Sequence, residues 1–356
     1  MFNPSNQNPS HQDKIDLHTL EDEPNWLLEI KHAIKNLAAL GEALELEKET
    51  LFKGQDAHKA FPLMVPRPYL KRIEKGNPND PLLLQILPIA QEMLEVPGYK
   101  QDPLAEQDHN PQKALVHKYQ SRVLVISSGT CAINCRYCFR RHFPYADNHL
   151  APSQWESLIA YIEAHPDINE VILSGGDPLM SKDKQLAQRI EAIEALPQIK
   201  RIRIHTRLPV VIPSRINDEM INWIKNTRLK VIMVWHINHA NEIDDLVIKA
   251  ANKLTKAGVT LLNQGVILKG INDTANAQVA LSEALFEADI LPYYMFTLDP
   301  VKGAAHFDIS LAQAQALMGE VAARLPGYLV PKLAKEVPGQ SAKTLFSPLL
   351  AQSNLA

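Results

Sequence analysis

Three cysteines stand close together near the middle of the chain. Cys131, Cys135 and Cys138 lie within eight positions and are the only cysteines in 356 residues. Their spacing, C-x3-C-x2-C, is typical of a loop in which three thiolates hold three irons of a [4Fe–4S] cluster. Thiolates are the soft ligands that such clusters prefer, and a set of three leaves the fourth iron open for chemistry. The spacing therefore predicts a catalytic iron–sulfur site.

Two other uses of these cysteines have to be weighed. A structural zinc site needs four protein ligands, and His142 is near enough in sequence to complete a Cys3His set. A disulfide framework is disfavoured, because the number of cysteines is odd and no secretory context is visible. The spacing favours the iron–sulfur cluster, and zinc stays open as the alternative.

The composition is that of a soluble globular protein. Hydrophobic residues make up 46% and charged residues 22% of the chain, and the net charge is −3. This charge gives no reason to expect a nucleic-acid-binding surface. Residues 1–14 are polar and lack the apolar core of a signal peptide, and no apolar run is long enough to span a bilayer. Together with the clustered free thiols, these features predict a cytoplasmic protein with no membrane partner.

Short apolar runs alternate with helical patterns from residue 122 onward. The first run, Arg122–Ser127, ends just before the cysteines, at the edge where α/β barrels place their active sites. Five more strands are predicted at Glu170–Leu173, Ile199–His205, Leu229–Trp235, Val259–Leu268 and Leu291–Leu298. This alternation predicts an α/β fold with parallel strands and helices outside. Six units make a partial (β/α)6 barrel with a lateral opening.

Flanking segments complete the predicted organisation. Residues 1–105 form a helical amino-terminal extension, of which about the first 22 are expected to be disordered because they are polar. Helices are predicted in it at Trp26–Leu46 and Pro81–Leu94. The barrel takes residues 106–330, and a C-terminal segment takes residues 331–356. Within the barrel, Ser153 and Glu156 match a capping box and predict a helix start at Ser153.

A glycine pair follows the second predicted strand, in the sequence SGGDP of residues 174–178. Two residues without side chains let backbone groups approach a ligand closely, although a lone Gly-Gly is usually only a turn. One strand after a C-x3-C-x2-C loop, the pair resembles the motif by which radical S-adenosylmethionine (SAM) enzymes hold the amino group of SAM. Asp177 then stands in the acidic position of that motif.

Further polar residues follow the later strands. Residues 139–143, FRRHF, suit either a solvated basic face or a receptor for carboxylate or phosphate. Polar side chains share a position at strand ends: His205, Thr206, Arg207, His236, Asn238, His239, Asn263, Gln264 and Asp299. Lys343 follows a Pro-Gly loop, where it is either an exposed amine or the lysine that bonds covalently to pyridoxal 5′-phosphate (PLP). The residue types alone do not decide between these two.

Taken together, residues from about Ala105 to Pro348 resemble the lysine 2,3-aminomutases. The motifs that carry the resemblance are HKYQSRVL, CAINCRYCFRR, LSGGDPL, RIHTRLPV, HINHANE, NQGVILKGIND and PGQSAK. The chain is most like the short branch, which supplies (R)-β-lysine for the modification of elongation factor P. Longer members carry extra cysteines for a zinc site toward their carboxyl end, and this chain has no such residues.

The resemblance implies a role for particular residues. Cys131, Cys135 and Cys138 would hold the [4Fe–4S] cluster, and Lys343 would carry PLP although Ser341 and Ala342 replace glycines of longer relatives. Residues implied at PLP are Lys118, Tyr119 and Arg122, and those implied around SAM are Gly175, Gly176, Asp177, His236 and Gln264. Arg140 would pair with the substrate carboxylate. Asp299 and Glu336 would receive the lysine ε-ammonium, with Glu336 standing where longer relatives have Asp.

The implied activity is conversion of L-lysine to (R)-β-lysine, an isomerase reaction that uses the [4Fe–4S] cluster, SAM and PLP. Reduced flavodoxin or ferredoxin would supply the electron, and elongation factor P with its lysine ligase would use the product. A homo-oligomer is possible in this family. A relative acting on glutamate is the nearest alternative, but Asp299 and Glu336 would repel an anionic side chain. The non-enzymatic zinc protein built on the cysteines and His142 is the second alternative.

Overall fold

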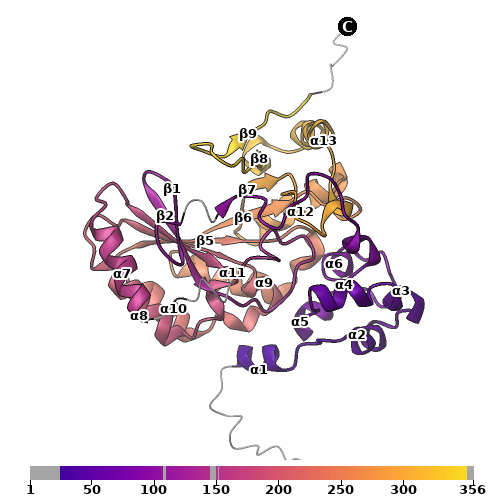
Figure 1. Cartoon of the computed structure of the whole chain (residues 1–356), viewed down its shortest axis with the longest axis horizontal. Helices are drawn as coiled ribbons and strands as arrows, with labels where there is room; N and C mark the ends of the chain where they lie inside the picture. Colours follow the sequence, from indigo (N-terminus) through magenta and orange to yellow (C-terminus); the bar gives the residue numbers. More distant parts are fainter. Residues whose placement is uncertain (1–24, 107–109, 145–149, 151, 351–356) are drawn as a thin grey trace, which may run out of the picture.

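A nine-stranded sheet forms the centre of the computed structural model, which describes residues 25–106, 110–144, 150 and 152–350 (Figure 1). The strands lie side by side in the order of the sequence, from β1 to β9. All pairs from β2 to β8 are parallel, whereas β1 and β9 add antiparallel edges. The strands are β1 (Leu115–Tyr119), β2 (Arg122–Ser128), β3 (Glu170–Gly175), β4 (Arg201–Thr206), β5 (Lys230–Trp235), β6 (Thr260–Val266), β7 (Leu291–Phe296), β8 (Lys332–Lys335) and β9 (Thr344–Leu345).

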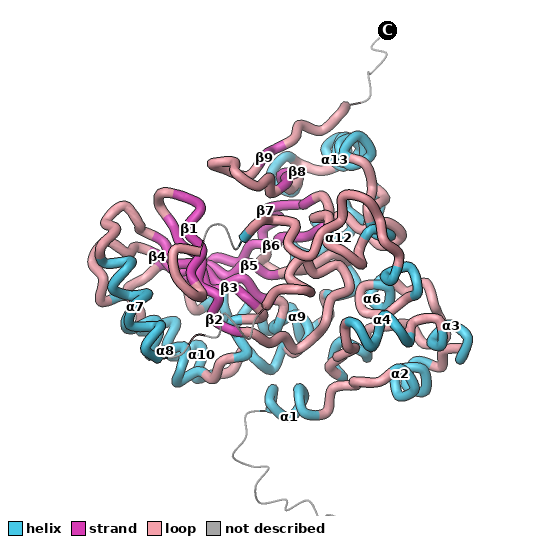
Figure 2. Tube along the Cα trace, in the orientation of Figure 1, coloured by secondary structure: helices cyan, strands magenta, loops and turns pink. Residues whose placement is uncertain are grey.

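Helices connect successive parallel strands and pack on the sheet (Figure 2). The longer ones are α7 (Pro152–Glu163), α8 (Asp183–Glu194), α10 (Asp218–Asn226), α11 (Asp245–Lys256), α12 (Ala275–Glu287) and α13 (Leu311–Arg324). The sheet does not close on itself within the described residues. Its first and last parts instead meet through the Tyr119 hydroxyl, which donates to Glu336 Oε1 at 2.7 Å. The result is the predicted partial barrel, with β8 as a seventh parallel strand.

Strand β4 illustrates how the sequence separates core from site. Ile202 and Ile204 are fully buried in the main hydrophobic core, while Arg201 and Arg203 point to the other face and pair with Glu170 of β3. Alternate residues of a strand face opposite sides, so one face of the sheet meets the helices and the other carries charged groups. The face of the sheet that lines the barrel interior therefore carries charged side chains in β3 and β4.

The amino-terminal extension consists of short helices in place of the two long ones predicted. Trp26–Leu46 is divided into α1 (Asn25–Lys31) and α2 (Leu37–Leu44), because Ile34 forms a backbone bridge with Val65 between them. Pro81–Leu94 is likewise divided into α6 (Pro81–Leu84) and the 3-10 turn η2 (Ala90–Met93). The remaining helices here are α3 (Lys48–Phe52), α4 (Gln55–Ala60) and α5 (Arg67–Leu70).

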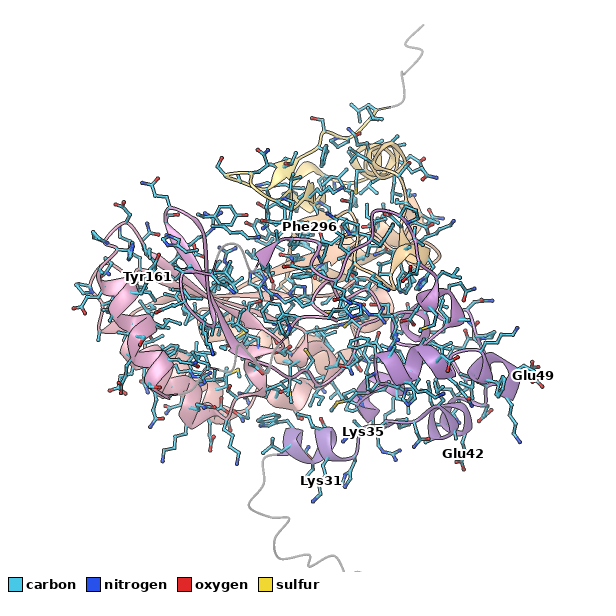
Figure 3. All side chains as sticks on the ribbon, in the orientation of Figure 1. Lys31, Lys35, Glu42, Glu49, Tyr161 and Phe296 are labelled. Atoms are coloured by element: carbon cyan, nitrogen blue, oxygen red, sulfur yellow. The ribbon has the colours of Figure 1, made fainter. Side chains whose placement is uncertain are left out.

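The helix predicted at Ser153 is present as α7, but it begins at Pro152. Ser153 therefore lies inside it, where its carbonyl accepts from Ser157 Oγ, and the predicted capping box is wrong. The extension shares one core with the barrel, in which Trp26 and Leu40 belong to the same cluster as Ile202. Its charged side chains, such as Glu42 and Glu49, project outward (Figure 3). Among the described helices, none has the length and apolar character that crossing a membrane requires.

Candidate active site

The cysteine loop leaves the carboxyl end of β2 and carries three free, partly exposed thiols. Burial raises the pKa of Cys131, and it raises that of Cys138 to about 11, with the neighbouring thiols adding to both shifts. Within the described ranges no group of three or more His, Cys, Asp or Glu side chains is arranged as a finished metal site. Three soft donors in one loop nevertheless fit the predicted cluster. Binding iron would have to displace their protons.

Buried arginines fix this loop to the amino-terminal extension. Arg136 is fully buried and pairs with Glu92 at 2.5 Å, while its Nη1 donates to the Phe61 carbonyl at 2.6 Å. Arg141 pairs with the same Glu92 at 2.6 Å. The composition of the extension did not indicate a role, but one of its acids, Glu92, forms ion pairs with two arginines of the cysteine loop.

Arg207, just after β4, contacts the middle thiol. Its Nη1 donates to Cys135 Sγ at 2.7 Å and to the Tyr137 hydroxyl at 2.6 Å, and its Nη2 donates to Gln85 and Glu242 at 2.7 Å each. Arg207 thus brings a buried cation into contact with one of the three predicted cluster ligands. Gln85 and Glu242 in turn prevent Arg207 from being an unpaired buried charge.

The glycine pair after β3 lies directly against the cysteine loop. Gly175 has a φ of 114°, and a Cβ there would lie 2.6 Å from the Ser128 carbonyl oxygen. A Cβ on Gly176 would lie 2.4 Å from the Thr130 carbonyl oxygen. The amide of Gly176 donates to Ser128 at 2.7 Å, and that of Asp177 donates to Thr130 at 2.8 Å. Only glycines let β3 and the loop form this backbone cradle, which fits the implied SAM site.

Asp177 uses its carboxylate inside the protein. It accepts from the Thr206 hydroxyl at 2.7 Å and from the amides of Arg207, Leu208 and Leu179 at 2.8–3.0 Å. These bonds hold the turn after β4, and with it Arg207, beside the cysteines. The implied contact of Asp177 with SAM stays a prediction.

Two half-buried histidines lie at the carboxyl ends of neighbouring strands, His205 in β4 and His236 just after β5. The rings of His205 and His236 have centroids 5.8 Å apart. Burial, with Arg207 and Arg140 nearby, lowers the pKa of His236 to about 4, so its ring is neutral near pH 7. A neutral imidazole can donate one hydrogen bond and accept another. Gln264, the other residue implied around SAM, lies one strand further along in β6.

Arg140 is buried and already holds a carboxylate. Its Nε and Nη2 donate to the two oxygens of Glu106 at 2.7 Å each, and its Nη1 donates to Ser174 Oγ at 3.0 Å. The sequence motifs did not indicate Glu106, because it lies outside all of them and no spacing distinguishes it from nearby acids such as Asp102. It stands at the predicted start of the barrel.

The lysine at the opposite part of the site lies next to an acid. Lys343 Nζ is 2.7 Å from Glu336 Oε2, and the rings of Tyr119 and Phe296 lie 5.8 and 5.6 Å from Nζ. Arg122 stacks over the Tyr119 ring at 4.0 Å. Lys118, whose Nζ donates to the Leu104 carbonyl at 3.1 Å, adds a second cation here. An amine between aromatic rings, with two cations for a phosphate, fits PLP.

Asp299 is the most unusual acid of the site. Burial, followed by the charges of Glu336 and Glu106, raises its pKa to about 7. In the part of the chain that the structure describes, nothing bonds its buried Oδ1 atom. A buried acceptor without a partner is costly, and a ligand cation would satisfy it. Asp299 therefore suits the ammonium group that the sequence predicted for it.

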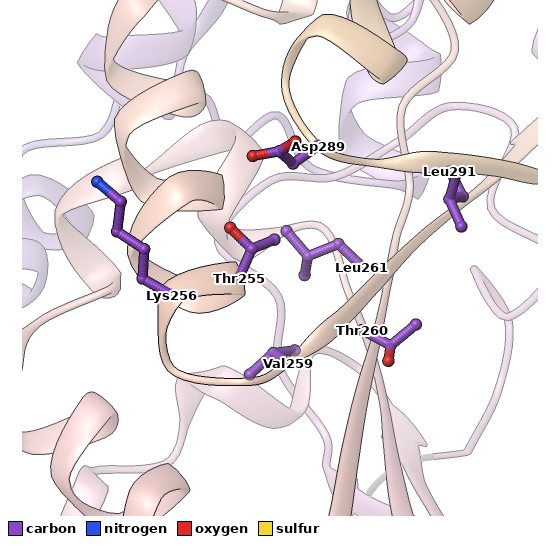
Figure 4. A pocket seen from close by; sticks show the side chains of 7 residues that line it. All are labelled: Thr255, Lys256, Val259, Thr260, Leu261, Asp289 and Leu291. Carbon is purple, nitrogen blue, oxygen red and sulfur yellow. The ribbon is translucent and has the colours of Figure 1, made fainter.

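Two hollows help to locate the site. One of about 130 Å³ borders Arg140 and Glu106 and is also lined by Gln101, Asp102, Phe139, His142, Phe143 and Pro144. The other, of about 460 Å³, lies at the amino ends of β6 and β7 and is lined by Thr255, Lys256, Val259, Thr260, Leu261, Asp289 and Leu291 (Figure 4). Barrel enzymes place chemistry at the carboxyl ends of their strands, which singles out the first hollow.

Known proteins resemble the chain in sequence over this whole region. The profile of the Radical SAM superfamily matches residues 125–279. The L-lysine 2,3-aminomutase of Haemophilus influenzae is 48% identical over 328 residues, which cover 92% of this chain and 97% of that protein. The Escherichia coli enzyme of the same name is 47% identical, with 92% and 96% covered.

The chain belongs to the lysine 2,3-aminomutase family. More distant members include the Clostridium subterminale L-lysine 2,3-aminomutase, 32% identical over 93% of this chain and 80% of that protein. The family uses a [4Fe–4S] cluster, SAM and PLP. Membership confirms the resemblance, the α/β radical SAM fold and an enzyme of isomerase type, and the alternative of a non-enzymatic zinc protein is thereby set aside. His142 instead has its Nε2 3.0 Å from the Lys302 carbonyl oxygen.

Proposed function

We propose that this protein is a PLP-dependent radical SAM enzyme that converts L-lysine to (R)-β-lysine. The observation that carries the proposal is the concurrence of three features at one edge of the sheet. The cysteine loop with Arg140 follows β2, Asp299 follows β7, and Lys343 with Glu336 flanks β8 and β9. The named activity of the relatives in Haemophilus influenzae and Escherichia coli supports the same substrate.

When bound, the cluster and SAM supply a radical that removes a hydrogen atom from the substrate, and PLP carries the migrating amino group. The residues of this chain bind and orient the lysine. Arg140 would receive the α-carboxylate through its planar fork of N–H donors. Asp299 and Glu336 would receive the ε-ammonium, so the two charged ends of lysine fix the carbon atoms between them.

Lys343 and Glu336 have a further task in this proposal. Glu336 Oε2 lies 2.7 Å from Lys343 Nζ, within hydrogen-bond distance of the amine. Lys343 must lose a proton before it can bond to PLP. Glu336 is the nearest described acceptor for that proton, and the Tyr119 hydroxyl keeps its carboxylate in place. Lys118 and Arg122 would hold the phosphate of PLP.

The test is a product assay with chiral analysis, run on reduced enzyme with PLP, in the presence and absence of SAM. The expected product is (R)-β-lysine, formed only with SAM. A β-glutamate product from glutamate, with no β-lysine from lysine, would sink the assignment. A reduced flavodoxin or ferredoxin is the proposed electron donor, and replacing it with a chemical reductant is the matching control.

We also propose that the β-lysine serves the modification of elongation factor P. The support is the resemblance to the short branch of the family and the near-complete coverage of the relatives that are 47–48% identical. Intact-mass measurement of elongation factor P from cells with and without this protein tests the link. An unchanged mass would separate the enzyme from that pathway without touching its proposed activity.

A further inference from the structure

Glu106 is a buried acid to which neither the motifs nor the relatives' names assign a role. Its side chain and that of Arg140 keep only 7% and 6% of their surface exposed. Two N–H groups of Arg140 donate to the two oxygens of Glu106, both at 2.7 Å. This two-point geometry is the strongest that an arginine and a carboxylate form.

The backbone around Glu106 holds the acid in place. Ala105 adopts a left-handed φ of 48°, a conformation costly for a residue other than glycine. The Glu106 amide donates to Asp102 Oδ1 at 3.3 Å, and the Leu104 carbonyl accepts from Lys118 at 3.1 Å. Strained positions of this kind persist where surrounding contacts over-determine them. The turn therefore ties the Arg140 pair to the region implied at PLP.

Two contacts of Arg140 Nη1 with neutral groups are weaker than the Glu106 pair. Its Nη1 donates to the Ser174 hydroxyl at 3.0 Å and lies 3.4 Å from the Gly175 carbonyl oxygen, so both partners are neutral and the second is beyond ideal range. Binding of a substrate carboxylate to Arg140 is more favourable if it replaces the neutral contacts with Ser174 and Gly175 than if it displaces Glu106, which Arg140 holds by two short ionic hydrogen bonds. Exchange at Nη1 leaves the Glu106 pair intact.

From this difference we infer that Glu106 is the positioning residue of Arg140. Glu106 stays bound to Arg140 while the α-carboxylate of an amino-acid substrate replaces Ser174 and Gly175 as the partner of Nη1. The inference rests on the proposed function, because it takes Arg140 as the receptor of that carboxylate. Glu106 would fix the plane of the guanidinium, and the substrate would meet an arginine already aimed at it. Selectivity for a carboxylate over a neutral amide follows from this arrangement.

The test compares L-lysine with L-lysinamide, which lacks the carboxylate charge. Binding of each to the holoenzyme is measured by anaerobic calorimetry without SAM, for wild type and for Glu106→Gln. The expected result is that Glu106→Gln weakens the binding of lysine about tenfold relative to that of lysinamide, the loss of one charge-assisted contact, because any effect of Glu106 on Asp299 is common to both ligands. Glu95→Gln is the control, because Glu95 is an exposed acid that pairs with Lys302 outside the site.

Each other result would overturn the inference. Tighter binding of lysine would make Glu106 a competitor that the substrate displaces, and equal weakening for both ligands would make it a structural residue only. Unchanged lysine binding would leave Arg140 correctly placed without it. Iron content and PLP absorbance show whether the variant is intact, and Glu106→Asp, which keeps the charge, serves if it is not. If wild type itself bound lysine no better than lysinamide, the proposed function would fail instead.

Discussion

The two ends of the candidate site are held in different ways. At the cysteine end, Arg136 and Glu92 have fully buried side chains, and Arg140 with Glu106 is nearly as enclosed. At the lysine end, Lys343 keeps 26% of its side chain exposed, and it precedes β9, a strand of two residues. Buried ion pairs therefore fix the geometry of the first end before any ligand binds. The second end is open, as it must be if a cofactor and an amino acid enter there.

Charge balance differs between these ends as well. At the cysteine end each buried acid faces at least one arginine within contact distance, and Arg136 and Arg141 share Glu92, so this end holds more arginines than acids. At the lysine end, Glu336 is shared by Lys343 and Tyr119, and Asp299 has its pKa raised to about 7. Asp299 Oδ1, which no described residue bonds, suits an incoming ammonium. Buried ion pairs hold the cysteine end in place, whereas the carboxylates of the lysine end can attract a cationic ligand.

Removing Lys343 should have the largest effect, and only at one end. Lys343→Ala takes away the amine that bonds to PLP, so turnover should fall by more than about a thousandfold. The visible absorbance of bound PLP should vanish, while iron content and cluster absorbance stay at the wild-type level. Covalent PLP that persists in the variant would place the PLP lysine elsewhere, and loss of the cluster would show that the ends are not independent.

Glu92→Gln should break the cysteine end. It leaves two buried arginines of the cysteine loop without their shared anion, so the free energy of unfolding should fall by about 3–5 kcal/mol. Anaerobic denaturant titration measures this change. The matched control is Glu95→Gln, an exposed acid of the same region whose ion pair with Lys302 is solvated. Equal stability of the two variants would contradict the description of this end as held by buried charge.

Asp299→Asn should disturb the lysine end through its pH dependence. With a pKa of about 7, Asp299 gains its charge as the pH rises through neutrality, and kcat/KM for lysine should rise with it. In the enzyme–substrate complex the bound ammonium favours the ionised form of Asp299. The rise of kcat with pH should therefore occur at lower pH than the rise of kcat/KM. The variant should lose this limb and bind lysine more weakly by about 2–3 kcal/mol. A pH profile unchanged by the substitution would remove Asp299 from the site.

The same acid should affect stability in a defined direction. Between its ordinary pKa of 3.8 and about 7, folded Asp299 holds a proton that the unfolded chain has released. Protonated Asp299 therefore stabilises the folded state at low pH, and the free energy of unfolding falls as the pH rises from 3.8 to about 7. The Asp299→Asn variant should not show that decline. Denaturant midpoints at pH 5 and pH 8, compared between wild type and variant, check the sign.

Glu336→Asp should give the smallest effect. It keeps the charge but withdraws the carboxylate by one methylene from Tyr119 and Lys343, each now at 2.7 Å. Losing one such bond costs about 1 kcal/mol, so KM for lysine should change by about fivefold or less. A change as large as that of Asp299→Asn would mean that the two acids have equal parts in binding.

Local patterns were enough to predict the barrel strands and the residues that follow them. β2 through β7 are runs of apolar or alternating residues, and each predicted strand is present within a few positions. Strand β8 was not predicted, because its four residues, KLAK, are too short to show a period. The long helix at Trp26–Leu46 was wrong because a tertiary bridge at Ile34 overrides a continuous helical pattern.

Contacts between distant segments were beyond prediction from one sequence. Arg140 could be singled out beside the last cysteine, but Glu106 lies 34 residues away in a turn without periodicity. Glu92, Gln85 and Tyr69 likewise reach the site from an extension whose composition carries no chemical signature. Their importance follows from desolvated charge, which depends on burial and hence on the complete fold.

The bond between Tyr119 and Glu336 joins positions 217 residues apart and brings together the first and last parts of the sheet. In the order of synthesis, the cysteine loop is made early and Lys343 much later. A growing chain can therefore hold the elements for the cluster while it still lacks the lysine and the acid beside it. Such long-range closure is slow and comes late in folding. Synthesis therefore completes the cysteine loop before the lysine and the acid at the other end of the site exist.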